Sequence, residues 1–276
     1  MDLGLRDRVA VIAGGSGGLG LAVARELLRE GADVAICARD PGRLAAAERE
    51  LRALARGRVL AARVDVRDGA ELRGWVDRVA AETGRLDIAV TNSGGPPIGY
   101  PTEFDVAAYR DAADTVLYPA IGLALAALPH LRARGWGRLL FIASETVVRP
   151  VADLTLSGVV RTGILRFAQG LVAELGASGV TVNVLAPAYL RTGPVERAAA
   201  DLAARRGSDV ETCVREMARH IPLGRIGHPE EFAALAAFLA SERAGFITGT
   251  VQLVDGGACA AGGLPSHLGF TRDVFQ

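Results

Sequence analysis

The stretch that decides the fold of this chain is Val9-Ala10-Val11-Ile12-Ala13-Gly14-Gly15-Ser16-Gly17-Gly18-Leu19-Gly20. Its first part is a short apolar run typical of a buried strand, and apolar residues then recur at helical spacing from Leu21 to Leu28. Glycines at such a turn let the backbone bend sharply and approach a ligand closely, and free N–H groups at the helix start favour negative charge. The stretch therefore predicts a cradle for the pyrophosphate of a dinucleotide. We expect the cradle to be lined by Gly14, Gly15, Ser16, Gly18, Leu19 and Gly20.

Three other interpretations of the same residues exist. A glycine-rich turn can be only a flexible turn. A P-loop would end in Gly-Lys-Ser or Gly-Lys-Thr, and it is excluded because the chain contains no lysine. Residues 14–18 also fit the G-x-S-x-G elbow that exposes a nucleophilic serine in hydrolases, but such an elbow would leave Gly20 without a role.

Length and composition favour one large soluble domain. A chain of 276 residues can bury a sizeable α/β core. The formal net charge is zero and the pI is about 6.9, so the net charge gives no electrostatic attraction to nucleic acid or anionic lipid. The start of the chain does not resemble a signal segment, and Cys37, Cys213 and Cys259 are isolated, without a metal-binding spacing. We expect a cytoplasmic protein without a metal, nucleic-acid partner or membrane partner.

The end of the second predicted strand bears on which dinucleotide binds. In NAD-selective sites of this kind a carboxylate near that point accepts the ribose 2′-OH, whereas a 2′-phosphate needs a cation. Here the strand 33–37 is followed by Ala38 and Arg39, and arginine grips phosphate with its planar fork. The sequence favours NADP(H), unless Arg39 is only a solvated surface residue.

Helical and strand patterns then alternate, which predicts parallel strands covered on both faces. Helices are expected at 41–55 and 69–83, and strands at 59–64 and 87–91. Asp65 and Val66 follow a strand end, where they could contact an adenine ring, although Asp65 or Asp68 could equally cap the next helix. The small residues Asn92, Ser93 and Gly94 break the fourth strand and would let the backbone lie beside the cofactor.

Two long apolar helices follow, at 105–134 and 154–175, and we expect each to pack on the sheet and on a partner subunit. Between them, a strand at 138–143 ends at Ser144. Further strands are expected at 180–185 and 250–254. The segment 193–221 has a polar helical pattern that is interrupted at 206–208.

Four motifs, in this order, make the chain resemble a short-chain dehydrogenase/reductase. They are G-x-x-x-G-x-G at 14–20, Asn-x-Gly at 92–94, the strand-end Ser144, and Pro-x-x-x-x-Thr at 187–192. The resemblance covers about residues 5–257, and 92–97 is similar to the 3-oxoacyl-carrier-protein-reductase-like branch. It implies one α/β Rossmann domain over 1–276 with seven parallel strands and helices on both faces. It also implies a homodimer or homotetramer, a substrate lid at about 193–221 and an added tail at about 259–276.

The resemblance implies that Ser144 hydrogen-bonds the substrate oxygen, but the rest of the family's active site is altered. The family places a tyrosine thirteen residues after the serine and a lysine four residues further, and here those positions hold Ser157 and Arg161. The family's asparagine falls at Val116. Arg161 can still hold the cofactor ribose and contribute positive charge. The loop that would lie against the nicotinamide contains Pro187, Leu190 and Thr192.

A serine hydroxyl is a poor acid, so Ser157 can donate or relay a hydrogen bond but cannot replace the tyrosine in proton transfer. Losing a positioned general acid typically slows a reaction on the order of 10²- to 10⁴-fold. Tyr189 and Glu145 are the remaining candidates for proton delivery. Tyr189 could instead be packing or substrate wall, and Glu145 an exposed loop carboxylate.

The sequence thus predicts an NADP(H)-dependent oxidoreductase that acts on a carbonyl or alcohol group of a small organic molecule, with atypical proton delivery. The alternative is a homologue that binds the cofactor without redox chemistry, as a regulatory subunit or a repurposed enzyme.

Overall fold

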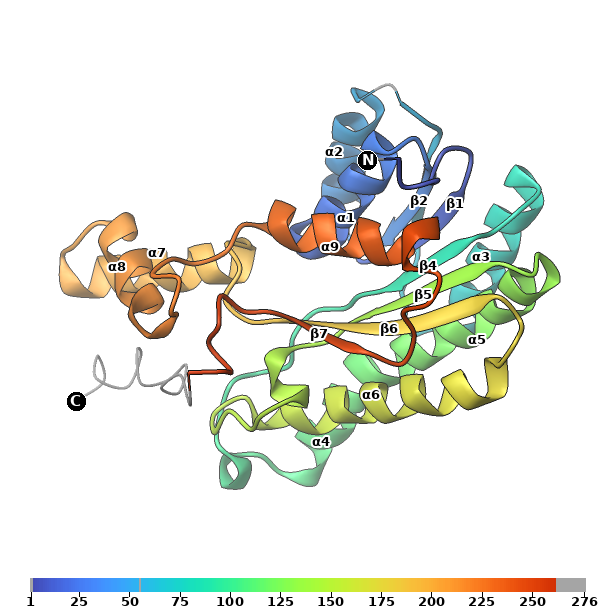
Figure 1. Ribbon diagram of the computed structural model, residues 1–276. Helices are drawn as coiled ribbons and strands as arrows, with labels where there is room; N and C mark the ends of the chain where they lie inside the picture. Colours follow the sequence, from blue (N-terminus) through green and yellow to red (C-terminus); the bar gives the residue numbers. More distant parts are fainter. Residues whose placement is uncertain (1, 55, 262–276) are drawn as a thin grey trace.

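A computed structural model describes residues 2–54 and 56–261 (Figure 1). Its centre is a sheet of seven strands in the order β3-β2-β1-β4-β5-β6-β7, and all neighbouring strands are parallel. The predicted doubly wound α/β fold is confirmed. The strands are β1 Val9–Ala13, β2 Asp33–Ala38, β3 Val59–Arg63, β4 Ile88–Thr91, β5 Gly137–Ile142, β6 Val180–Pro187 and β7 Val251–Val254.

The central strands are buried on both faces, which explains their almost continuous apolar sequences. Every residue of β1, β4, β5 and β6 is buried. Alternate side chains enter two separate cores: Val11 packs on one face of the sheet, and Ile12 on the other. The register places Val11 between Ala35 of β2 and Ala89 of β4.

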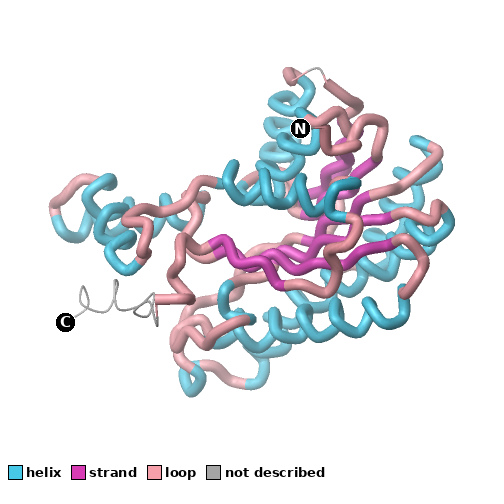
Figure 2. The backbone as a smooth tube through the Cα atoms, viewed as in Figure 1, coloured by secondary structure: helices cyan, strands magenta, loops and turns pink. Residues whose placement is uncertain are grey.

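Helices cover both faces (Figures 1 and 2). One layer contains α1 Gly18–Arg29, α2 Pro41–Arg52 and α9 Pro229–Ala240. The other contains α3 Gly69–Thr83, α4 Val106–Ala112, α5 Tyr118–Ala133 and α6 Thr155–Leu175. The helix α2 ends before the predicted end at residue 55. Beyond it the chain passes close to the segment before β2, where a Cβ on Gly57 would lie 2.5 Å from the carbonyl oxygen of Ala32.

The predicted helix at 105–134 begins after Asp105, whose carboxylate accepts the N–H of Ala108. The sequence did not indicate the π-helical turn at Ala113–Leu117 that separates α4 from α5. By length and composition alone, Val106–Ala133 is the one helix in the described part of the chain that could cross a membrane. In this fold α5 packs on β4 and β5, as a core helix does.

The segment predicted as a lid forms two helices, α7 Gly193–Arg206 and α8 Val210–Met217, which project from the sheet layers (Figure 1). Gly207 separates them in a left-handed conformation with φ of 62°, as the interruption of the pattern predicted. The two helices have a small apolar core of their own. Of the predicted tail at about 259–276, residues 262–276 lie outside the described part of the chain.

Two phenylalanines test this packing. Phe232 of α9 is fully buried against the sheet, whereas Phe246 is fully exposed. We expect Phe232→Ala to lower the free energy of unfolding by about 3–5 kcal/mol, because it leaves a cavity. Phe246→Ala is the control and should change it by less than about 0.5 kcal/mol. Urea unfolding followed by circular dichroism measures both, and equal effects would contradict the described packing.

Candidate active site

The residues predicted to bind cofactor and substrate follow the carboxyl ends of neighbouring strands, where open parallel sheets bind ligands. Gly14 follows β1, Asn92 follows β4, and Ser144 lies just beyond β5. The segment 187–192 begins at the last residue of β6. The fold therefore brings these predicted residues to one edge of the sheet.

The glycine turn has the geometry that the sequence predicted. Gly14 has φ of 60°, and a Cβ there would lie 2.7 Å from Nδ2 of Asn92. A Cβ on Gly20 would lie 2.5 Å from the carbonyl oxygen of Gly14, which accepts a hydrogen bond from Asn92 Nδ2 at 3.3 Å. Helix α1 begins at Gly18, and Thr192 lies opposite, 3.9 Å from the Cβ position of Gly18. Gly15 and Ser16 belong to the same turn, and Leu19 lies in the first turn of α1.

Two arginines stand beside this turn, and sequence reasoning found only one of them. Arg39 is exposed directly after β2. Nη2 of Arg43 lies 2.7 Å from the Cβ position of Gly17 in the cradle. Arg43 sits there because Asp40 caps α2 by accepting the Arg43 N–H at 2.7 Å. The pattern of a capping aspartate with an arginine three residues later was the available signal.

The predicted adenine-side residues lie at the end of β3. Asp65 is held by Arg67, whose hydrogen bonds lower the pKa of Asp65 to about 2. The carboxylate that caps α3 belongs to Asp68, so of the two capping alternatives only Asp68 is correct. Val66 is partly buried against the core beneath this edge.

The loop after β4 runs from the cradle to the substrate side. Ser93 and Gly94 continue from Asn92 without regular structure. Further along, the N–H of Gly99 donates to the carbonyl oxygen of Asp153 at 2.7 Å. This bond ties the loop to the segment that precedes α6, so the two loops form one wall.

Ser144 and Ser157 are linked through a single guanidinium. Nε of Arg161 donates to Oγ of Ser157 at 3.2 Å. Nη1 of Arg161 donates to the carbonyl oxygens of Ile142 at 3.1 Å and Ala143 at 2.9 Å. Ala143 directly precedes Ser144, whose Oγ accepts the N–H of Thr146 at 3.3 Å. The substituted positions of the family motif therefore make a connected arrangement.

The side chain of Arg161 is a buried cation. Burial lowers its pKa to about 10, so it stays charged at neutral pH. Within the described part of the chain, no carboxylate lies at ion-pair distance from it. Nη2 has no hydrogen-bond partner among those residues, so its N–H groups remain for a ligand.

Glu145 is buried, so the alternative of an exposed loop carboxylate is wrong. Its Oε2 pairs with Nη2 of Arg149 at 2.8 Å, and the thiol of Cys259 lies 3.8 Å from the same oxygen. Burial raises the pKa of Glu145, while the Arg149 charge partly opposes this. The side chain therefore joins the turn after Ser144 to the segment after β7.

Tyr189 is buried in the core of the lid helices. Burial raises the pKa of its phenol, and the negative charges of Glu145 and Asp153 raise it further. The neighbouring Leu190 is also buried and pairs with Gly227 in a short bridge. The burial of Tyr189 is compatible with the alternative of a packing residue, and its phenol is a weaker acid than a free tyrosine.

Val116 occupies the π-helical turn and is fully buried. It lines a cavity of only about 10 Å³ together with Thr91, Asn92 and Ile164. A valine offers no polar side-chain group here, so this position cannot take part in a hydrogen-bonded relay through its side chain.

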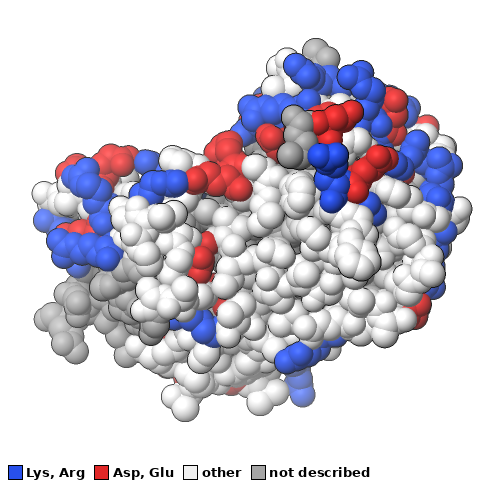
Figure 3. Space-filling view, in the orientation of Figure 1, with Lys and Arg blue, Asp and Glu red and all other residues white. Residues whose placement is uncertain are grey.

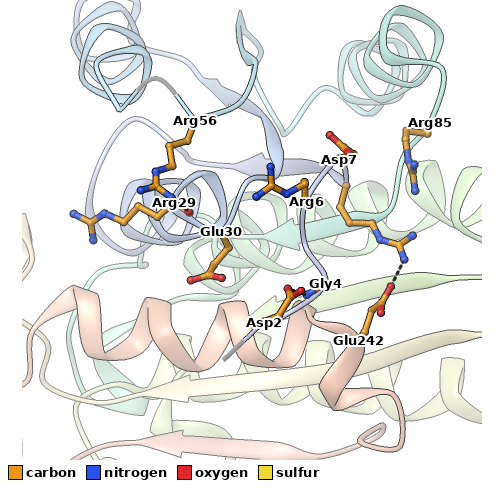
Figure 4. Close-up of a pocket in the computed structure, with 10 residues that line it drawn as sticks. Asp2, Gly4, Arg6, Asp7, Arg29, Glu30, Arg56, Arg85 and Glu242 are labelled. Atoms are coloured by element: carbon orange, nitrogen blue, oxygen red, sulfur yellow. Dashed lines mark hydrogen bonds and ion pairs between the residues drawn. The ribbon is translucent and has the colours of Figure 1, made fainter.

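A larger hollow, about 700 Å³, lies at the opposite edge of the sheet (Figure 4). Its arginines are largely engaged with acids: Arg8 pairs with Asp87 and Glu242, and Arg85 pairs with Asp87. It contains none of the predicted site residues. Among the described residues, no three His, Cys, Asp or Glu side chains gather as metal ligands would.

Comparison with known proteins agrees with this geometry. Residues 13–259 match a family model described as enoyl-(acyl carrier protein) reductase. A cis-4-hydroxycyclohexanecarboxylate dehydrogenase of Sinomonas cyclohexanicum is 35% identical over 92% of this chain and 97% of its own length. An L-fucose dehydrogenase of Bos taurus is 34% identical, and the match covers 100% of this chain and 96% of its own length.

A solved structure gives the same result for the fold. L-sorbose reductase from Gluconobacter frateurii, complexed with NADPH and L-sorbose, superimposes with a TM-score of 0.89 at 32% identity, covering 93% of this chain and 98% of that one. Together with the glycine turn, the strand order and the position of Ser144, these matches show that the chain belongs to the short-chain dehydrogenase/reductase family.

Proposed function

We propose that the protein is an NADP(H)-dependent oxidoreductase that interconverts a carbonyl and an alcohol group on a small organic molecule. The observation that carries this proposal is the meeting of three features at one sheet edge. These are the glycine cradle, the two arginines 39 and 43 that follow β2, and the serine that follows β5.

The cradle fits a dinucleotide. Side chains at Gly14 or Gly20 would collide with Asn92 or with the turn itself, which leaves bare backbone for a pyrophosphate. Arg39 and Arg43 fit a 2′-phosphate. When bound, the cofactor exchanges a hydride with the substrate carbon. The residues proposed to hold its remaining parts are Asp65, Val66, Asn92, Ser93, Gly94, Arg161, Pro187, Leu190 and Thr192.

The names of the relatives support a small, oxygen-rich substrate. They are a hydroxycyclohexanecarboxylate dehydrogenase, an L-fucose dehydrogenase and an L-sorbose reductase. We place the substrate oxygen at Ser144, between the wall formed by 94–99 and the lid. We propose that Ser144, Ser157 and Arg161 act on the substrate oxygen, and that the buried Glu145 and Tyr189 hold the turn after Ser144 and the lid in place beside it.

A second function is a cofactor-binding homologue without redox chemistry. The observation that favours it is the loss of the family's tyrosine, lysine and asparagine at Ser157, Arg161 and Val116. The intact cradle is compatible with both functions, so turnover must distinguish them.

We also propose a homodimer or homotetramer in the cytoplasm. Figure 3 shows few charged side chains on the face that carries β7 and α6. Several large apolar side chains on these and adjoining elements are exposed, namely Tyr118, Leu125, Val159 and Leu253. Such a surface is typical of a subunit contact.

The two arginines test the cofactor proposal. We expect Arg39→Ala and Arg43→Ala each to weaken NADPH binding by about 10- to 100-fold, because each removes a charge-assisted hydrogen bond to the 2′-phosphate. NADH binding should change little, and Arg73→Ala on the exposed side of α3 is the control. Cofactor fluorescence measures the affinities. Equal losses for NADPH and NADH would contradict the assignment.

Turnover tests the reaction. We expect the purified protein to oxidise NADPH in the presence of some members of a ketone panel that includes L-sorbose. Ser144→Ala should lower kcat/KM on the order of 10²-fold, because it removes a donor to the developing negative charge. Tight NADPH binding without oxidation of NADPH across the panel would favour the non-redox function instead.

A further inference from the structure

We propose that Ser144 and Ser157 form a two-hydroxyl oxyanion site backed by the charge of Arg161, and that water supplies the proton. We infer that the substrate is a carbonyl compound with an electron-withdrawing group beside the carbonyl, such as an α-hydroxy ketone or an α-diketone. This inference rests on the proposed function and names the substrate class of that same site.

The hydroxyl hydrogens of Ser144 and Ser157 are both free to be donated to a ligand. A serine hydroxyl has one donor and two acceptor lone pairs. Oγ of Ser144 accepts a hydrogen bond from the N–H of Thr146, and Oγ of Ser157 accepts one from Nε of Arg161. In the described part of the chain neither hydroxyl has an acceptor for its own hydrogen. Each serine oxygen therefore accepts a hydrogen bond from the protein, and each hydroxyl can still donate its hydrogen to a bound substrate.

One guanidinium supports both hydroxyls. Arg161 bonds Ser157 directly, and it bonds the carbonyl oxygen of Ala143 in the peptide that leads into Ser144. The turn after Ser144 also packs on the first turns of α6, where Thr146 lies against Gly158. The two donors are thus held on one rigid support, as a preorganised site requires.

The buried positive charge of Arg161 favours the binding of a negatively charged group. An unpaired cation in the interior is costly, and neutral carbonyls only partly compensate the Arg161 charge. Such groups concentrate at functional sites. A negative charge that develops on the substrate oxygen in front of the two serines would be stabilised by this cation at short range.

The available groups make poor general acids. Arginine does not release its proton in proteins, and a serine hydroxyl does not titrate usefully. Tyr189 is buried among the lid helices, beside the negative charges of Glu145 and Asp153, and Glu145 is engaged by Arg149. Stabilisation of an oxyanion by hydrogen bonds requires none of these groups to lose a proton.

The reduction is balanced with water as the only further reactant. Hydride adds to the carbonyl carbon, the C=O π bond breaks, and its electron pair moves to the oxygen. The bound NADPH is oxidised to NADP⁺. The alkoxide, held by Ser144 and Ser157, then takes a proton from water and leaves hydroxide to the solvent. Alcohol oxidation is the reverse.

The substrate class follows from this chemistry. Without a positioned acid, the substrate oxygen is not protonated during hydride transfer. The activation free energy of that step therefore depends on how well the oxygen can carry a negative charge. Electron-withdrawing neighbours lower the basicity of that alkoxide, so activated ketones should react much faster than simple ketones. An enzyme with a tyrosine acid depends less on alkoxide basicity, because proton transfer relieves the charge.

A dye that becomes an oxyanion tests the site without turnover. We would titrate para-nitrophenol into the protein–NADP⁺ complex below the pKa of the free dye and record the absorbance of the phenolate band. Wild type should bind the dye as phenolate. Ser157→Ala should weaken phenolate binding by about 10- to 100-fold, because a hydrogen bond to a charged group is lost. Ser157→Thr retains the hydroxyl and should retain binding.

The matched control is Ser178→Ala, which removes a hydroxyl that accepts the N–H of Val180 at the start of β6. It should bind the dye as wild type does. Dye that binds only in its neutral form, that fails to bind, or that binds equally well to Ser157→Ala would overturn the oxyanion site. Cofactor fluorescence with each variant confirms that the cradle is still folded.

Kinetics then separate this inference from the proposed function. Across acetophenones that differ only in a ring substituent, kcat/KM of the wild-type protein should rise steeply with the electron-withdrawing strength of the substituent. As the pH is raised, kcat/KM should not fall in the way it does when an enzyme's general acid loses its proton. The double variant Ser157→Tyr/Arg161→Lys restores the family pair and should show a shallower dependence. Turnover with a shallow dependence in wild type would overturn the inference alone. Absence of both NADPH binding and turnover would overturn the proposed function.

Discussion

The interaction on which the site depends is the set of hydrogen bonds made by Arg161 inside the protein. One guanidinium holds Ser157 and the carbonyls at the end of β5, and so fixes the position from which Ser144 projects. A lysine has a single ammonium group and could not match this planar fork. The replacement of lysine by arginine is therefore a change of architecture as well as a loss of a proton relay.

The parallel sheet makes this arrangement possible. Because every strand runs in the same direction, β1, β4, β5 and β6 deliver their following loops to one edge. The cradle, the loop that begins at Asn92, and the segment ending at Thr192 surround the proposed cofactor site. Thr192 lies beside the cradle, with Cγ2 3.9 Å from the Cβ position of Gly18. The buried Glu145, paired with Arg149, then brings the turn after Ser144 against Cys259 in the segment that follows the last strand.

Much of the fold and of the glycine cradle was predictable because a parallel sheet imposes strong patterns on the sequence. Strands buried on both faces have continuous apolar sequences. A Cβ on Gly14 or Gly20 would lie 2.7 or 2.5 Å from a neighbouring atom, and Gly18 has a positive φ of 54°, so each position favours glycine. Other features depend on contacts between distant segments and leave no local pattern. The burial of Glu145 and the bonds of Arg161 to β5 are of this kind. The π-helical turn around Val116 was missed because its apolar sequence is equally suited to a regular helix.

The most direct test of the central claim is a crystal structure of the protein with NADP⁺ and the alcohol of its best substrate. We predict that the alcohol oxygen lies within about 3 Å of both Ser144 Oγ and Ser157 Oγ. Arg161 should still donate to Ser157 and to the carbonyl of Ala143. An alcohol oxygen bound instead by Tyr189 or Glu145, or an Arg161 side chain that has left the end of β5, would contradict the account.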